Sequence, residues 1–166
     1  IYKKAKRAHL LKIEHYAAVD FMKIRVGQKR QVILATGSLA PPIRAMGTCV
    51  RKMMIGWGVD PDQHKKRTRP VRSIGDTKDW MQSKDYPKDM LRERQPALIN
   101  YRLSIDEEGK ATACHIQQTT RPKEFDDAVC NSLMKRSSFT PALDADGNPM
   151  ASYWRSQVRF TIGSSL

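Results

Sequence analysis

The chain has 166 residues, 40% of them hydrophobic, and a formal net charge of +13. That length suits one ordinary domain or two small ones, and the apolar content supports a packed core rather than general disorder. No run of 18 or more apolar residues occurs, so the sequence predicts no membrane-spanning helix. The first residues are charged and lack an apolar h-region, so no signal peptide is predicted.

The positive charge is concentrated in the first half. Residues 1–80 hold 18 lysines and arginines against 6 acidic residues, whereas residues 81–166 hold 12 against 11. Such a field attracts polyanions, and residues 1–80 are a candidate contact for an anionic surface. The alternative is a solvated basic face that keeps the protein soluble. No nucleic-acid motif accompanies the charge, so specific nucleic-acid binding is not expected.

The first half predicts a hairpin followed by a helix. Two β-rich runs within 19–35 flank Gly27, which is a hairpin pattern. Apolar residues then recur at helical spacing up to Gly58: Ile43, Met46, Val50, Met53, Met54 and Trp57. This stripe is expected to pack in a core rather than form a partner surface. Cys49 lies near it and is expected to be buried.

Residues 58–85 are the least regular part of the sequence, because Pro61, Pro70 and Gly75 interrupt them. We interpret them as a linker that lies over the surface. Trp80 and Met81 are expected to hold it against a flanking domain. His64 is expected to be solvated.

The second half has the pattern of an α+β domain. Tyr86-Pro87 precedes a short helix that ends near residue 94. Side chains alternate over 97–105, a turn containing Gly109 follows, and a return strand covers 111–119. A helix lies within 119–139, with Asp126 and Asp127 near its start, and a last alternating strand begins at 153.

Nothing in this pattern indicates catalysis. The sequence has no nucleophile elbow, phosphate loop or metal-ligand spacing. The Asp126–Asp127 pair is explained by the dipole of its helix, and His115 is expected to point away from that helix. We therefore expect a protein that is not an enzyme and that needs no cofactor or metal.

Several features taken in order resemble the C-terminal domain of the TonB energy-transducer family. These are YP, a short helix, a hairpin with a D-x-x-G turn, a helix with an acidic pair, the junction SFTPALDADGNP and a final amphipathic strand. The resemblance covers residues 86–162. It implies a helix-hairpin-helix-strand domain with an antiparallel sheet. The predicted organisation is a basic hairpin and helix over 1–57, or the end of a larger domain, then a linker over 58–85 and this domain over 86–162.

The resemblance also implies a function. In the family, a peptide of an outer-membrane transporter adds to the edge of the last strand, and backbone hydrogen bonds supply the affinity. The equivalent strand here is 153–162. The candidate partner-binding residues are Tyr153, Trp154, Ser156, Val158 and Phe160, with Tyr86 and Pro87 in support. Alternatively, Trp154, Val158 and Phe160 pack on the helix at 122–136; a strand can use its face for the core and its edge for a partner.

Two cysteines bear on the cellular compartment. Cys114 shares a strand face with Ile116, and Cys130 lies on the helix expected to pack there. A disulfide between them would close a loop of about 15 residues and contribute roughly 3 kcal/mol. Two buried thiols are the alternative. A disulfide fits an oxidising compartment such as the periplasm.

Two functions from different classes follow. The first is a periplasmic TonB-like module that binds a transporter peptide during energy-dependent transport. The second is a structural subunit of an envelope or membrane assembly that keeps the fold and docks through its basic first half. The family often carries a Gln before YP that contacts the peptide, and here Gln82 is offset from that place. Association with the membrane through a partner, and a homodimer, are compatible with both.

Overall fold

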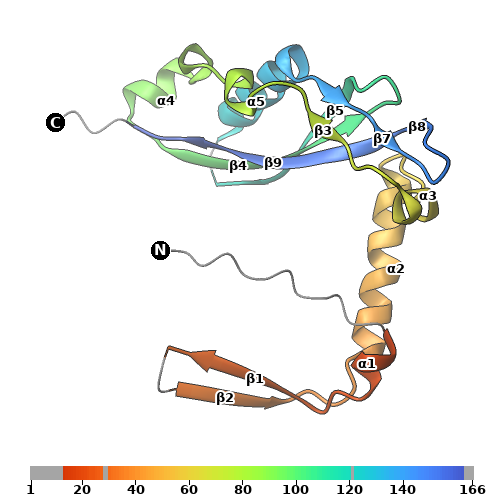
Figure 1. Cartoon of the computed structure of the whole chain (residues 1–166). Helices are drawn as coiled ribbons and strands as arrows, with labels where there is room; N and C mark the ends of the chain where they lie inside the picture. The colour runs from red at the N-terminus through yellow and green to blue at the C-terminus, as the bar shows by residue number, and fades with distance from the viewer. Residues whose placement is uncertain (1–12, 28–29, 121, 163–166) are drawn as a thin grey trace. The chain divides into compact units, whose positions relative to one another are not determined.

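The computed structural model describes residues 13–27, 30–120 and 122–162 (Figure 1). The chain divides into two compact units, Ile1–Met53 and Met54–Leu166. Parts of the basic region predicted over 1–57, namely residues 1–12 and 28–29, lie outside the described residues. Among the described helices, none combines the length and the apolar character needed to cross a bilayer.

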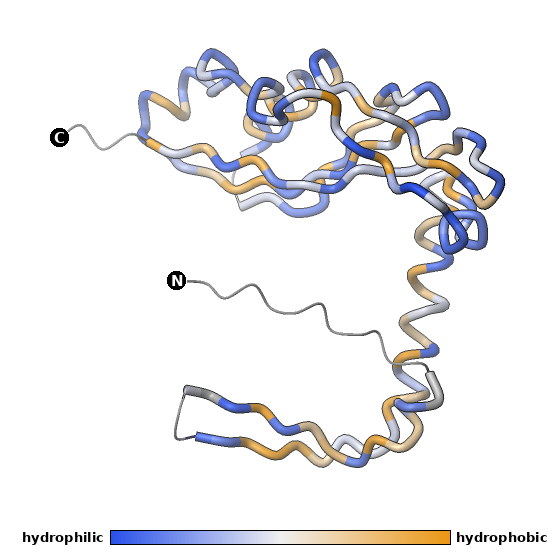
Figure 2. The backbone as a smooth tube through the Cα atoms, viewed as in Figure 1, coloured by the Kyte–Doolittle hydropathy of each residue, from blue (hydrophilic) through white to orange (hydrophobic). Residues whose placement is uncertain are grey.

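The first unit contains a short helix and a hairpin. Helix α1 (Ile13–Ala17) precedes strands β1 (Phe21–Val26) and β2 (Arg30–Ala35), which pair antiparallel. The pairs Met22–Leu34 and Ile24–Val32 place four apolar side chains on one face. Figure 2 shows hydrophobic positions along both strands of the hairpin. All four are 40–46% exposed. Two strands alone cannot bury an apolar face, so this one stays open to solvent.

Helix α2 (Ala40–Gly56) begins with Pro41 and Pro42 in its first turn, where a missing backbone N–H costs nothing. The expectation that its apolar stripe is core is wrong for Met46, Val50 and Met53, which are exposed; Met54 is buried. Cys49 is also exposed, contrary to expectation. The physical reason is that one helix and a two-stranded hairpin enclose little volume.

The second unit is built on a three-stranded antiparallel sheet. Strand β4 (Ala97–Ile105) lies between β5 (Ala111–Thr119) and β9 (Ser152–Phe160), so β5 and β9 are the edge strands. Side chains of β4 alternate between the two faces. Ile99, Leu103 and Ile105 are buried on the face that meets helix α5.

Helix α5 (Lys123–Arg136) covers that face of the sheet (Figure 1). Its residues Phe125, Val129 and Leu133 recur at helical spacing and are at most 1% exposed. Burying one such side chain contributes about 1.5–3 kcal/mol. The combination of helices and an antiparallel sheet confirms the predicted α+β class.

Short elements complete the second unit. Before the sheet come α3 (Pro61–Lys66), β3 (Arg72–Ser73), the 3-10 helices η1 (Thr77–Trp80) and η2 (Ser83–Asp85), and α4 (Lys88–Arg92). After α5 come β6 (Phe139–Thr140), β7 (Ala142–Leu143) and β8 (Pro149–Met150). Strand β3 pairs with β6, and Val71 and Trp80 join the hydrophobic core. Residues 58–85 thus belong to the second unit and contribute to its core.

Candidate functional site

The edge of β9 is the first component of the candidate site. Within the described residues, β9 pairs with β4 along its whole length and with no strand on its other side. The outward backbone groups of such an edge can pair with another extended chain. The strand is nine residues long, which is enough for several backbone hydrogen bonds.

A groove runs beside this edge, and we call it the β9 groove. One part, of about 310 Å³, is lined by Thr77, Lys78, Met81, Tyr101, Leu133, Ser156, Gln157, Val158 and Arg159. The next part, of about 210 Å³, is lined by Met81, Gln82, Ser83, Tyr86, Val158, Arg159, Phe160 and Thr161. Met81 and Val158 line both parts, so the two are continuous. One wall is the strand and the other is the segment that contains η1 and η2.

The wall opposite β9 is fixed by α5. Arg136 donates from Nε to the carbonyl of Trp80 at 2.9 Å and pairs with the carboxylate of Asp85. The Trp80 ring packs against Phe139 and Trp154, with centroids 5.0 and 6.3 Å away. These contacts hold the last residue of each 3-10 helix, so the wall of the groove is already in place before any partner binds.

The contacts around Asp85 change the pKa of its carboxyl group. Burial by itself raises the pKa of its carboxyl group, but the Gln82 backbone N–H, the Arg136 charge and the Ser132 hydroxyl together hold that pKa below its usual value. The Gln82 N–H donates to Oδ2 of Asp85 at 2.7 Å. The carboxylate is therefore ionised at neutral pH and holds the turn between Gln82 and Tyr86.

Tyr86 connects the groove to the core. Its hydroxyl donates to the carbonyl of Gln95, and its ring lies 5.7 Å from Phe125 and 5.1 Å from Phe160. Burial raises the pKa of the Tyr86 hydroxyl. Pro87 is the N-cap residue of α4. Both residues thus fix where the short helix starts relative to the end of β9.

The candidate residues of β9 divide between its two faces. Trp154 and Val158 are partly buried against the core, and Phe160 is buried in it. Ser156 is exposed and lines the groove with Val158. Tyr153 lies on the opposite face, next to Trp57 and His64. The groove therefore uses only part of the set identified from the sequence.

Sequence reasoning missed the other wall. Thr77, Lys78 and Met81 line the groove, although 58–85 was interpreted as a linker. Gln82 also lines the groove, although its place in the sequence is offset from the Gln that the family often carries before YP. The available signal was the apolar pair Trp80-Met81 in an otherwise polar stretch, five residues before Tyr86-Pro87.

His64 is not solvated as expected. It is half-buried and stacks on Tyr153, with ring centroids 5.2 Å apart and planes 9° from parallel. Burial, with a smaller effect from the Arg67 charge, lowers the pKa of His64. The ring is covered because residues after α2 return to the sheet: Trp57 meets Tyr153 edge-on at 5.1 Å.

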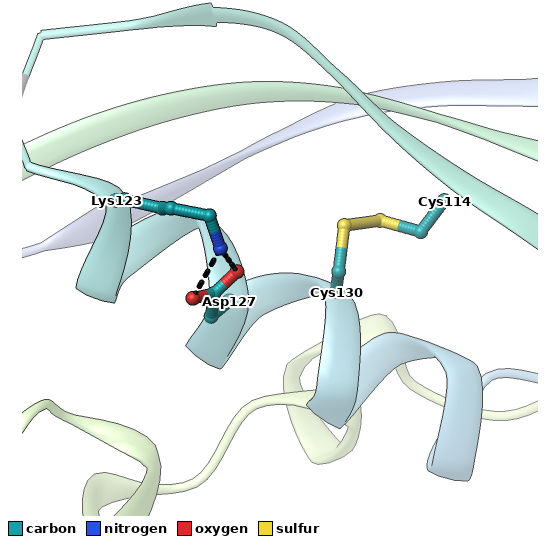
Figure 3. A network of polar contacts seen from close by, with 4 residues as sticks. All are labelled: Cys114, Lys123, Asp127 and Cys130. Carbon is teal, nitrogen blue, oxygen red and sulfur yellow. Dashed lines mark hydrogen bonds and ion pairs between the residues drawn. A yellow bond between two sulfur atoms is a disulfide. The ribbon is translucent and has the colours of Figure 1, made fainter.

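The two remaining sequence features lie on α5 and β5. Cys114 of β5 and Cys130 of α5 form a disulfide with Cα atoms 5.5 Å apart (Figure 3). In the first turns of α5, Lys123 donates to Asp127 at 2.5 and 2.6 Å. Hydrogen bonding to Asp127 and its charge are the main causes that raise the pKa of Lys123. Asp127 thus has a structural partner, and the disulfide ties an edge strand to the helix that covers it.

Taken together, fold and site define a small α+β module with a free strand edge and a preformed groove beside it. The family model for the Gram-negative bacterial TonB protein C-terminal matches residues 82–162. These residues therefore belong to the TonB C-terminal family, which confirms the resemblance. Domains of this family are non-enzymatic modules of envelope transport that interact with outer-membrane transporters.

A solved structure is also similar to this chain: the solution NMR structure of the Pseudomonas aeruginosa TonB C-terminal domain. The identity is 16%, the match covers 58% of this chain and 90% of that one, and the TM-score is 0.44. No curated protein matches the chain.

Proposed function

We propose that residues 82–162 act in the periplasm and bind an extended peptide of an outer-membrane transporter, which adds as a further strand to the edge of β9 during energy-dependent transport. The observation that carries this proposal is the coincidence of a free nine-residue edge with a groove along the same strand. Backbone pairing at the edge supplies affinity, and the groove selects side chains.

The walls of the groove indicate what the peptide presents. Met81, Val158 and Phe160 are apolar, so alternate residues of the peptide are apolar where they face the core side of β9. Successive residues of a strand point to opposite faces, so the intervening residues point the other way. We expect an alternating peptide without proline at the pairing positions, because proline has no N–H to donate.

The direct test uses the peptide rather than the protein. A synthetic peptide from the N-terminal segment of an outer-membrane transporter is titrated into the full chain and followed by amide NMR. Signals of residues 156–161 are expected to shift. N-methylation of the alternate peptide residues whose N–H groups face β9 abolishes binding, whereas methylation of the other set leaves it nearly unchanged. Equal effects of the two sets would contradict strand addition.

A protein variant tests the groove. Met81→Ala removes part of both sections of the groove without altering β9, and we expect about tenfold weaker peptide binding, as for a buried apolar contact of an interface. Met134→Ala is the matched control, because Met134 is exposed on α5. Equal affinity of the Met81→Ala variant and the unaltered chain would contradict the role of the groove. If no peptide binds the unaltered chain at millimolar concentration, the structural-subunit alternative is favoured.

A further inference from the structure

A second surface lies on the face of the sheet that α5 does not cover, and we call it the back face. The pairing registers place on it Leu98, Asn100, Arg102, Ser104, His115, Gln118, Tyr153, Arg155, Gln157 and Arg159. No residue of this set is acidic. The acidic residues of the second half lie instead on α4 and α5, in turns and in η2, so the charges of residues 81–166 are segregated between surfaces.

Part of the back face is covered and the rest is hollow. Trp57 lies over Arg102, with the guanidinium carbon 4.3 Å from the ring centroid, and Arg102 is only 3% exposed. The uncovered part forms an open hollow of about 540 Å³ lined by Asn100, Gln117, Gln118, Arg155, Ser156 and Gln157. Four of these six side chains are amides, and one is a guanidinium.

The positive charge beside the hollow is uncompensated. Arg102 and Arg155 are directly opposite on β4 and β9, an arrangement of like charges that disfavours the sheet. Arg102 donates to Ser104 Oγ at 3.0 Å, and within the described residues neither arginine has a carboxylate partner. His115 is opposite Arg102 on the other side, and burial, followed by the Arg102 charge, lowers its pKa. An anion placed beside Arg155 would relieve this repulsion.

The amides distinguish among anions. Each Asn or Gln side chain offers donors and an acceptor, so a ligand that uses both must itself donate and accept. Hydroxyl groups do this, whereas phosphate and carboxylate oxygens only accept. The hollow is lined by no aromatic ring, and single-stranded nucleic acid binds mainly by stacking bases on aromatic side chains. The chemistry fits a ligand with many hydroxyls and intermittent negative charge.

We propose that the back-face hollow binds an acidic polysaccharide, with Arg155 pairing with a sugar carboxylate and Asn100, Gln118 and Gln157 hydrogen-bonding to hydroxyls. Arg155 and Arg159 are four residues apart on β9, which separates their Cα atoms by about 13 Å at the usual rise of a strand. Negative charges at intervals along a glycan can thus meet both arginines. The hollow shares Ser156 and Gln157 with the β9 groove, whereas Asn100, Gln118 and Arg155 line the hollow and not the groove.

The test follows residues that line the hollow, because the basic first half of the chain would bind any polyanion and mask binding at the hollow. Tri-galacturonic acid is titrated into the full chain, and the side-chain amide NMR signals of Asn100 and Gln118 are followed. These signals are expected to shift. Arg155→Gln weakens the effect about tenfold. Lys135→Gln, which removes the same charge from the exposed surface of α5, changes it less than twofold.

Three outcomes would overturn the proposal. Equal shifts with uncharged maltotriose would show that the arginine plays no part. Equal shifts with pyrophosphate would show a general anion site without use of the hydroxyls. Shifts confined to residues 21–53, or no shifts at tens of millimolar ligand, would show that the hollow does not bind.

Discussion

Both units of the chain contain large apolar side chains, but the two units differ in how far these side chains are buried. In the second unit α5 covers one sheet face, and Phe125 is 0% exposed. Among the described residues of the first unit, no helix covers the hairpin in this way, and Phe21 is 58% exposed. Alternation of apolar and polar residues therefore specifies a strand, whereas burial of its apolar face requires a second layer.

The largest expected effect comes from the core phenylalanine. Phe125→Ala leaves a cavity and is expected to lower the free energy of unfolding of the second unit by about 3–5 kcal/mol. Phe21→Ala, at an exposed position, should change the stability of the first unit by less than about 0.5 kcal/mol. Urea unfolding followed by tryptophan fluorescence measures the second unit, which contains Trp57, Trp80 and Trp154, and hydrogen exchange of the β1 and β2 amides measures the first. Similar losses in both variants would break the contrast.

The second largest effect on stability is expected from removal of the disulfide. Replacing both Cys114 and Cys130 by Ala is expected to lower the free energy of unfolding by roughly 3 kcal/mol. The two cysteines are 16 residues apart in sequence, and the bond between them restricts the unfolded chain by closing this loop. Cys49→Ala, which alters the exposed free thiol of the first unit, serves as the control. The same fluorescence assay applies. If intact mass without reductant shows three free thiols, the bond does not form and this prediction fails.

A pair of glycines sharpens the contrast within the second unit. Both Gly109 and Gly147 have positive φ, of 81° and 87°, so alanine is strained at either position. At Gly109 an added Cβ would also lie 2.0 Å from the carbonyl oxygen of Phe139, whereas Gly147 has open space. We expect losses of about 2–3 kcal/mol for Gly109→Ala and about 1 kcal/mol for Gly147→Ala. Equal losses would mean that the Gly109 turn can move away from β6.

The smallest expected effect depends on pH. The pKa of Asp85 is lower in the folded state, so its stabilising contribution is present above the ordinary carboxyl pKa of about 3.9 and is lost as the pH falls through the lower folded value. Asp85→Asn should cost about 1.5 kcal/mol at pH 7 and less below pH 3. Asp127→Asn, at an exposed pair, is the control. Unfolding curves across this range measure the difference, and a cost that does not depend on pH would contradict the assigned role.

Much of the candidate site could be predicted from the sequence because it depends on local pattern. The alternation over 97–105 and from 153 onward corresponds to β4 and β9. The resemblance then identified the last strand as the partner edge. The second wall could not be found this way, since Thr77 and Met81 reach the groove only through the contact of Arg136 with Trp80 and Asp85. Those partners are more than 50 residues apart.

The family of residues 82–162, the α+β class and the concentration of positive charge in residues 1–80 can all be identified from the sequence, because they follow from local order and composition. Which apolar stripes are buried, where the groove beside β9 lies and which residues form the back face become visible in the folded chain. The physical reason is that burial, register and charge pairing depend on which segments meet across the chain. A one-residue change of register would move every side chain of β9 to the other face.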